Sequence, residues 1–358
     1  MARIAYIFIA ITTAFIFSDI VLASERAYIP LDDMTVQVID TDTNTIIDSI
    51  PSAGDPSGIG VSPNGRRVYV LRDLTNDVAV IDSFLNQIIA TIPAEGNPSC
   101  IAVTPDSTRG YLVNNGPGTV SFLNLVNNFV IDSIDIVNGT DSSGCAITPD
   151  GSHVYITNLA NNLVNILRTS DNTFIGDIDV GSAQPAAKVS PDGQTLYVIV
   201  SGVDELAVIR TSDNTVIDTI PLGNSPRNLT ISPDSTRVYV TDDVDNNVSV
   251  IDTSTNSVIA TIPVGEGSRD IDITSDGQFL YVVADGNDRV VVVRTSNNQI
   301  VSTIPVASTP QAEGMFIVDP DAAFVRPIPT LSQWGIIALV LLFGVIGLIA
   351  VKKKKATG

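Results

Sequence analysis

The stretch VSVIDTSTNSVIATIPVG (residues 248–265) contains two runs of β-branched residues that flank a polar turn. VSVID and VIATI have the length and composition of β-strands, and small and polar residues around Asn256 separate them. Asparagine tolerates the left-handed backbone of a tight hairpin better than most residues do. The stretch therefore predicts an antiparallel β-hairpin with Asn256 in its turn.

This hairpin belongs to a unit that recurs along the chain. The same asparagine is found at Asn44, Asn86, Asn128, Asn172, Asn214, Asn256 and Asn298. Successive copies are 42 residues apart, except for one spacing of 44. Each unit continues with a second hairpin, around turns such as PNG (residues 63–65) or PDG (residues 149–151), and so supplies four short strands. Because propellers have about four to eight four-stranded blades, the repeats predict an all-β, seven-bladed β-propeller.

The two ends of the repeat region predict that the ring closes on itself. Ala27–Ile29 lies just before Val36 and matches the VYV strand that precedes the hairpin in later units. The first unit therefore lacks its innermost strand. We expect Gly314–Val318 (GMFIV) to supply that strand, because a shared blade leaves no open sheet edge between the first and last blades.

The segments VYVLRD, VYITNLANN and VYVTDD, together with the opening hairpin, resemble the repeats of the YVTN-type β-propeller family. The resemblance extends over residues 27–325, and we expect one propeller domain at residues 24–326. It implies a family that includes bacterial and archaeal surface proteins, with lactonases and cofactor-binding dehydrogenases among its relatives. Because one fold carries many functions, the resemblance implies a fold rather than an activity.

Both ends of the chain carry apolar segments of the kind that direct export. Residues 1–23 combine Arg3, an apolar run and small residues before a cleavage position near Ala23, which predicts a signal peptide; an uncleaved anchor is the alternative. Residues 335–351 contain no charged residue and are about as long as the shortest membrane-spanning helices. Lys352–Lys355 would form the cytoplasmic flank of this transmembrane helix, which places the propeller outside the membrane.

The residues in front of that apolar segment resemble a bacterial sorting signal. IPTLSQWG, followed by the apolar segment and the lysines, is similar to the IPTL-CTERM signal. Its motif residues are Ile328, Pro329, Thr330, Leu331, Trp334 and Gly335. Gln333 stands where family members usually carry an acidic residue. The resemblance implies that an exosortase-like enzyme processes residues 327–358, that the membrane holds the precursor at least transiently, and that the mature protein is at the cell surface or extracellular.

The charge of the chain narrows the range of partners. The formal net charge is −20, and removing the four tail lysines leaves −24 for the exported part, since Arg3 and Asp19 cancel in the leader. Nucleic acid is excluded, because its binding depends on Lys and Arg that neutralise phosphates. The acidic loops at residues 242–247 and 284–289 allow weak calcium binding, although solvated acidic loops are the ordinary case. We expect a monomer without a cofactor.

Few side chains indicate catalysis. His153, the one histidine, starts a predicted strand, where a lone histidine is more often a solvated flank than an acid–base group. No haem-attachment motif, phosphate-binding loop or nucleophile elbow is present in the sequence. Cys100 and Cys145 lie on the predicted innermost strands of adjacent blades, one position out of phase. They can face each other in a disulfide, or point apart as buried thiols, which is the commoner outcome.

Polar residues are unevenly distributed over the predicted innermost strands, which line the channel of a propeller. The first three units place Gly58, Cys100 and Gly144 there, whereas the later units contribute polar and charged residues. The candidates for a ligand or cation site at the channel mouth are Lys188, Arg227, Asn228, Arg269, Asp270, Asp272 and Glu313. A shaped cavity with a few converging polar groups is typical of a binding site. The alternative is a water-filled channel whose charges pair with one another.

Three functions are compatible with these features. The first is a non-enzymatic interaction or scaffold module that presents its loops to a protein or polysaccharide partner. The second is a lactonase-like hydrolase with a metal held by the residues Asn228, Asp270, Asp272 and Glu313. The third is a small-molecule sensor or carrier that uses the same part of the channel. We favour the first, because the sequence contains so few reactive groups.

Overall fold

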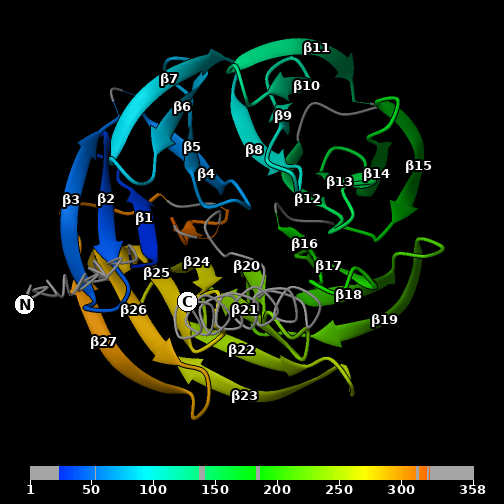
Figure 1. Cartoon of the computed structure of the whole chain (residues 1–358). Coiled ribbons are helices and arrows are strands. Elements are labelled where there is room, and N and C mark those ends of the chain that lie inside the picture. Colours follow the sequence, from blue (N-terminus) through cyan, green and yellow to red (C-terminus); the bar gives the residue numbers. More distant parts are fainter. Residues whose placement is uncertain are drawn as a thin grey trace, which may run out of the picture.

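The computed structural model describes residues 24–52, 54–136, 142–182, 186–311, 314–320 and 322. Seven four-stranded antiparallel sheets surround a common centre (Figure 1). Each sheet is one blade, and its strands follow one another from the centre to the rim. This arrangement confirms the predicted all-β propeller with seven blades.

The four strands of each blade lie side by side in order from the innermost to the outermost. Blade 1 contains β28 (Ile317–Val318), β1 (Arg26–Pro30), β2 (Thr35–Asp40) and β3 (Thr45–Pro51). Blade 2 contains β4 (Pro56–Val61), β5 (Arg67–Arg72), β6 (Asp77–Asp82) and β7 (Gln87–Pro93). Blade 3 contains β8 (Pro98–Val103), β9 (Arg109–Asn114), β10 (Thr119–Asn124) and β11 (Phe129–Asp135). Blade 4 contains β12 (Ser142–Ile147), β13 (His153–Asn158), β14 (Leu163–Arg168) and β15 (Thr173–Asp179).

The other three blades have the same order. Blade 5 contains β16 (Ala187–Val189), β17 (Thr195–Val200), β18 (Glu205–Arg210) and β19 (Thr215–Pro221). Blade 6 contains β20 (Pro226–Ile231), β21 (Arg237–Asp242), β22 (Asn247–Asp252) and β23 (Ser257–Pro263). Blade 7 contains β24 (Ser268–Ile273), β25 (Phe279–Ala284), β26 (Arg289–Arg294) and β27 (Gln299–Pro305). A 3-10 turn, η1 (Asp285–Asn287), joins β25 and β26.

The two predicted export segments fall outside the part of the chain that the structure describes. They are the signal peptide at residues 1–23 and the C-terminal helix at residues 335–351, together with the sorting motif in front of that helix. In the described part, none of the helical turns is long and apolar enough to cross a membrane.

The repeated asparagines form the outer hairpin turns and also link neighbouring blades. All seven have a positive φ, between 46° and 57°, which confirms the predicted left-handed turn. Four of them accept a hydrogen bond from a tyrosine hydroxyl of the preceding blade. These pairs are Tyr28–Asn86 at 2.7 Å, Tyr111–Asn172 at 3.1 Å, Tyr155–Asn214 at 2.8 Å and Tyr281–Asn44 at 2.7 Å. The last pair joins blade 7 to blade 1 and therefore helps to hold the ring closed.

Apolar side chains fill the spaces between neighbouring blades. One cluster combines Tyr197 and Leu206 of blade 5 with Val238 and Val240 of blade 6. Another cluster is shared by blades 7, 1 and 2 and contains the fully buried Tyr281. Because each sheet is covered on both faces by its neighbours, its inner strands are runs of β-branched and aromatic residues.

Blade 1 closes the ring with strands from both ends of the chain, as predicted. β28 pairs antiparallel with β1, so that Val318 lies opposite Arg26 and Ile317 opposite Ala27. In addition, the Tyr28 N–H donates to the Phe316 carbonyl at 2.9 Å. We call residues 314–318 the closing segment.

A buried carboxylate in blade 6 makes stability depend on pH. Asp242 is fully buried, and its Oδ2 accepts a hydrogen bond from Ser249 Oγ at 2.6 Å. Burial raises the pKa of Asp242 to about 6, against the opposing effect of the Ser249 hydrogen bond and with a further increase from Asp245. The folded state therefore binds a proton that the unfolded state has lost, and the free energy of unfolding decreases as the pH rises from about 4 to about 6.

We expect Asp242→Asn to raise the melting temperature at pH 7 and to leave it nearly unchanged at pH 4. In blade 3 the position equivalent to Asp242 is the uncharged Asn114, which donates to Ser121 Oγ at 2.8 Å. An asparagine therefore fits this buried position beside a serine. Thermal denaturation at pH 4, 5.5 and 7 measures the effect. Asp213→Asn, which breaks an exposed ion pair with Arg210, is the control that brings no stabilisation. A lower melting temperature of Asp242→Asn at pH 7 would contradict the expectation.

Candidate functional site

The innermost strands enclose two cavities along the central channel. The upper cavity, of about 160 Å³, lies where these strands begin, and the lower cavity, of about 340 Å³, lies where they end. Lys188 of β16 and Met315 of the closing segment line both cavities. Val189 of β16 lines both cavities as well, and these three residues mark the boundary between the cavities.

The upper cavity has a polar side and a side of small residues. Lys188, Arg227, Asn228 and Arg269 line it from blades 5, 6 and 7. Blades 2, 3 and 4 contribute mainly small and apolar residues, such as Gly60, Ala102, Gly144 and Ala146. None of the described lining residues is an aspartate or a glutamate. Four of the seven candidates predicted at the channel mouth thus lie together around one cavity.

Each arginine of the upper cavity is held by an aspartate that does not line it. Arg227 Nε lies 3.3 Å from Asp243 Oδ2, and Arg269 Nε lies 2.5 Å from Asp285 Oδ2. Burial raises the pKa of Asp285, and the positive charge of Arg269 opposes this shift. Because the aspartates come from the loops that follow β21 and β25, each ion pair fixes the direction of its arginine.

The two candidate carboxylates of β24 bind the closing segment. Asp270 Oδ2 accepts the Gly314 N–H at 3.0 Å, and its Oδ1 accepts Asn228 Nδ2 at 2.6 Å. Asp272 Oδ2 accepts the N–H groups of Phe316 and Ile317, each at 2.9 Å. In a regular sheet, the carbonyl groups of a neighbouring strand would accept these backbone N–H groups. Here the two carboxylates accept them instead. Glu313, the remaining candidate, lies outside the described residues.

Lys188 supplies positive charge near these carboxylates. Asp272 is almost completely buried, and this burial raises the pKa of its carboxyl group. The positive charge of Lys188 and the backbone hydrogen bonds act in the opposite direction. Lys188 is the one lysine outside the C-terminal tail, and it lies where the channel needs a cation to balance Asp272.

Glu25 is a channel residue that sequence reasoning missed. It lines the lower cavity together with Asp272 and Asp319, and its Oε1 accepts the Ser275 N–H at 2.8 Å. Burial raises the pKa of Glu25 to about 7, against the effect of the Ser275 hydrogen bonds. No sequence signal indicated this contact, because Glu25 precedes the first repeat and Ser275 lies 250 residues further on.

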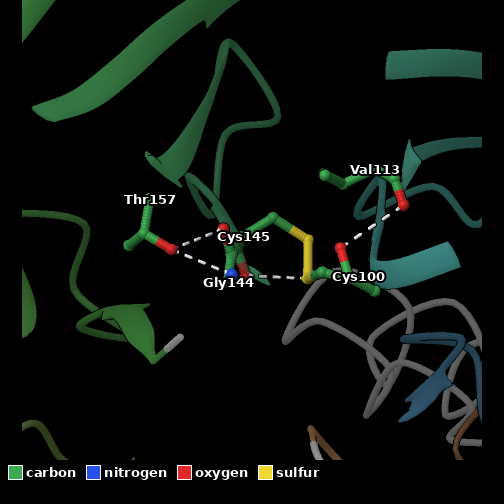
Figure 2. Close-up of a disulfide and its surroundings, with 6 residues drawn as sticks. Cys100, Val113, Gly144, Cys145 and Thr157 are labelled. Atoms are coloured by element: carbon green, nitrogen blue, oxygen red, sulfur yellow. Dashed lines mark hydrogen bonds between the residues drawn. A yellow bond between two sulfur atoms is a disulfide. The ribbon is translucent and has the colours of Figure 1, made fainter. Parts of the chain in front are cut away.

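A disulfide joins Cys100 of β8 to Cys145 of β12 on the wall of the upper cavity (Figure 2). The bond connects the innermost strands of blades 3 and 4, with the two Cα atoms 5.9 Å apart. The sequence allowed either a disulfide or two thiols, and the structure shows the disulfide. It is compatible with export, because disulfides persist in oxidising compartments.

The described residues contain no cluster of three or more His, Cys, Asp and Glu side chains that could hold a metal ion. His153 begins β13 and lies within hydrogen-bond distance of Ser152 Oγ, at 2.8 Å. It is not among the described residues that line either cavity.

The fold and the channel identify the protein as a seven-bladed β-propeller. Comparison with known families narrows this class to one family. The model of the family described as lactonase, seven-bladed beta-propeller, matches residues 83–325. The chain belongs to this family. A second model, the IPTL-CTERM motif, matches residues 326–352 and confirms the predicted sorting signal. The protein is therefore an exported, sorted member of a lactonase-type propeller family.

Solved structures share the fold at low sequence identity, and a comparison with curated proteins returns no match. A functionally unknown protein from Desulfotomaculum acetoxidans is 19% identical, with a TM-score of 0.72 over 83% of this chain and 100% of that one. Hydrazine synthase from Kuenenia stuttgartiensis is 20% identical, with a TM-score of 0.66 over 75% and 90%. A protein assigned as a 6-phosphogluconolactonase from Bacteroides uniformis is 14% identical, with a TM-score of 0.66 over 81% and 98%. At these identities the likeness shows the fold.

Proposed function

We propose that the protein is a non-enzymatic binding module of the cell surface whose upper cavity receives a small anionic ligand. The observation that carries this proposal is the lining of that cavity. Lys188, Arg227 and Arg269 face it, and no carboxylate is among its described lining residues, in a chain with a net charge of −20. A cluster of cations in an acidic molecule favours a ligand of negative charge.

The groups around the upper cavity suit a carboxylate or a phosphate. Guanidinium groups recognise such planar or tetrahedral anions through paired hydrogen bonds, and the ammonium group of Lys188 adds a point charge. Asn228 supplies an amide at the same level of the channel. The small residues of blades 2 to 4 leave the space for the ligand. The size of the cavity, about 160 Å³, limits the ligand to a small molecule.

The structure supports binding over metal-assisted hydrolysis. A metal at the channel mouth would draw on Asn228, Asp270 and Asp272, but Asp270 and Asp272 accept backbone N–H groups of the closing segment. A metal ion bound to these two carboxylates would leave the N–H groups of the closing segment without acceptors. Their position therefore supports a role in ring closure. A ligand would share Arg227 and Arg269 with the aspartates that orient them.

Titration calorimetry with inorganic phosphate and with malonate tests the proposal. We expect one binding site per chain, and Lys188→Gln should weaken binding by about ten- to a hundredfold, because a hydrogen bond between charged groups is worth about 1.5–3 kcal/mol. Arg210→Gln is the control, since Arg210 forms an exposed ion pair with Asp213 away from the channel. Equal affinities of the wild type and Lys188→Gln would contradict the proposal.

A lactonase-like hydrolase is the second candidate, and the family match over residues 83–325 favours it. Two of the structural neighbours are assigned as 6-phosphogluconolactonases, whose name specifies a phosphorylated sugar lactone. Such a ligand would also be an anion, so both candidates place it in the same cavity. The two candidates differ in the fate of the ligand. A binding module releases it unchanged, whereas a hydrolase releases it with the lactone ring opened.

We also propose partners for this protein. The match of the sorting motif at residues 326–352 supports an exosortase-like enzyme that acts on the precursor. A C-terminal helix would hold that precursor in the membrane until processing. Loop faces of the ring offer further surface for a protein or a polysaccharide.

A further inference from the structure

Exposed apolar side chains gather on the outer turns and strands of blades 2 and 3. Phe84, Leu85, Val126 and Phe129 are 45% to 67% exposed, and we call them the apolar patch. Blades 2 and 3 are neighbours, and their outer strands β7 and β11 contact each other. Blade 6, by contrast, has Ser254, Thr255 and Ser257 at the positions of Phe84, Leu85 and Phe129. The patch is therefore a local departure from the polar turns of the repeat, and it marks an interaction surface.

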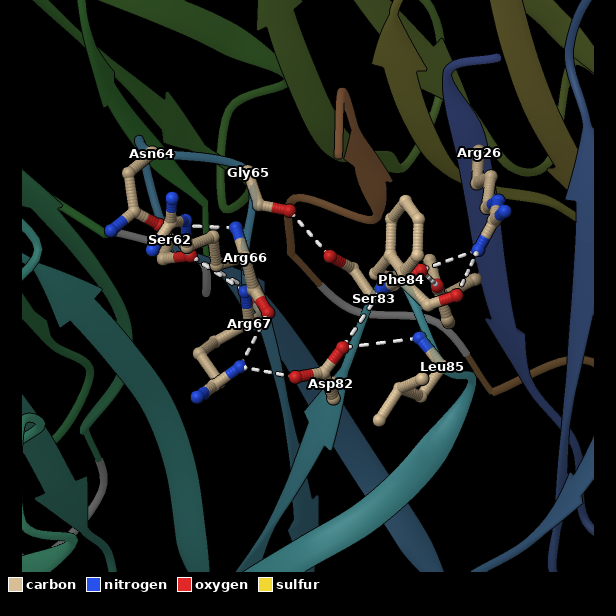
Figure 3. Close-up of polar contacts among 11 residues, drawn as sticks. Arg26, Ser62, Asn64, Gly65, Arg66, Arg67, Asp82, Ser83, Phe84 and Leu85 are labelled. Carbon is tan, nitrogen blue, oxygen red and sulfur yellow. Dashed lines mark hydrogen bonds and ion pairs between the residues drawn. The ribbon is translucent and has the colours of Figure 1, made fainter. Parts of the chain in front are cut away.

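The N-terminal end of the described chain lies directly beside the apolar patch. Arg26, at the start of β1, donates from Nη1 to the Ser83 and Phe84 carbonyls and to Asn86 Oδ1 (Figure 3). These acceptors belong to the turn that carries Phe84 and Leu85. The apolar leader of residues 1–23 therefore joins the ring at this turn.

The C-terminal end leaves the ring on the same face. The Asp319 carbonyl packs so closely on Gly65 that a Cβ atom at residue 65 would lie 1.7 Å from it. Gly65 in turn accepts Ser83 Oγ at 2.5 Å, next to the patch (Figure 3). From Ala322, the twelve residues 323–334 lead to the apolar segment at residues 335–351, a reach of up to about 45 Å when extended.

Arginines lie in the same two blades as the apolar patch. Arg66 precedes β5. Arg67 begins β5 and pairs with Asp82 at 2.8 Å, and Arg109 begins β9 in blade 3. Arg26 and Arg67 thus lie beside the turn that carries Phe84 and Leu85, in a chain of net charge −20. Their presence reduces the repulsion between this face and phosphate headgroups, which the rest of the acidic surface would experience.

We propose that the apolar patch is the surface on which the membrane-held precursor rests against the lipid bilayer. This inference rests on the proposed membrane attachment of the precursor. The C-terminal end leaves the ring at this face, so the apolar segment at residues 335–351 holds this face toward the lipid. Phe84 and Leu85 then enter the boundary between headgroups and acyl chains, as exposed aromatic and aliphatic side chains do at membrane surfaces.

Quenching of a single tryptophan by brominated lipid tests this orientation. The full chain carries Trp334→Phe, which removes the one native tryptophan, together with Phe84→Trp, and is reconstituted in phosphatidylcholine vesicles with brominated acyl chains. Leu74→Trp is the matched control, because Leu74 is 67% exposed and belongs to the loop at the opposite end of the same blade. We expect residue 84 to lose roughly half of its emission and residue 74 almost none, since interfacial side chains reach about 5–10 Å into the bilayer.

Each other result would overturn the inference in a different way. Equal quenching at residues 84 and 74 would show that the ring has no fixed orientation on the bilayer. A blue shift of the residue 84 emission without vesicles, growing with protein concentration, would show that a second copy covers the patch. A chain that fails to float with the vesicles would remove the membrane attachment itself, while leaving ligand binding in the channel untouched. Circular dichroism and the melting temperature show whether each variant is folded.

Discussion

We expect Asp272→Ala to lower the free energy of unfolding by about 3 kcal/mol or more, because each buried donor left without an acceptor costs about 1–3 kcal/mol. The side chain accepts three backbone N–H groups, those of Ile273, Phe316 and Ile317. Two of these groups belong to the closing segment, so the substitution weakens the contact that joins the two ends of the chain. Burial disfavours the ionised carboxylate of Asp272 and raises its pKa. The variant no longer has this unfavourable burial, which offsets part of the loss in stability.

Urea denaturation followed by circular dichroism measures this loss. Asp272→Asn should have an intermediate effect, because the amide retains one acceptor oxygen. Asp276→Ala is the control in the same blade, since Asp276 is an exposed turn residue that accepts Thr274 Oγ1 and the Gln278 N–H. If Asp272→Ala and Asp276→Ala had the same midpoint, Asp272 would not be essential for ring closure.

Replacing both Cys100 and Cys145 by serine should lower the free energy of unfolding by about 4 kcal/mol in the chain-entropy model for a loop of 45 residues. The disulfide connects innermost strands of adjacent blades, and the loop that it closes contains most of blade 3. Without the bond, the unfolded chain gains conformational freedom while the folded ring keeps its other contacts.

Denaturation with and without dithiothreitol separates this effect from the serine substitutions. The wild type should lose stability in the reductant, and the double variant should not respond to it. Alkylation of the unfolded protein under non-reducing conditions, followed by mass spectrometry, counts free thiols. Two alkylated cysteines in the exported protein would contradict the disulfide.

The fold could be predicted in nearly all its parts, because its determinants are local and repeated. The period of 42 residues fixes the blade, and the asparagine at each outer hairpin satisfies a backbone requirement that few other residues meet. Ring closure also followed from the sequence, since the first unit visibly lacks a strand that Gly314–Val318 matches.

The candidate site was predicted in composition but not in its contacts. The strand register placed Lys188, Arg227, Asn228 and Arg269 in the channel, where the structure has them. The partners of Asp270 and Asp272 were missed, because they are N–H groups of an irregular segment 44 and 45 residues away. Strand parity alone could not decide between a disulfide and two free thiols.

The links between tyrosine and asparagine were also missed, although the sequence contains their signal. Tyr28 and Asn86 are 58 residues apart, Tyr155 and Asn214 are 59 apart, and both residue types recur with the period of the blades. Two positions that recur at a constant offset longer than one repeat are candidates for contacts between neighbouring blades. Pattern analysis within a single unit cannot show such pairs.

Proton NMR of the full chain with a phosphorylated sugar δ-lactone tests the central claim most directly, because it reports binding and ring opening in one sample. We expect the lactone signals to broaden on binding to the wild type and to broaden less with Lys188→Gln at the same concentrations. The lactone should open at its rate in buffer with both proteins. Ring opening that the wild type accelerates and Lys188→Gln does not would contradict the non-enzymatic module and assign the channel to a hydrolase.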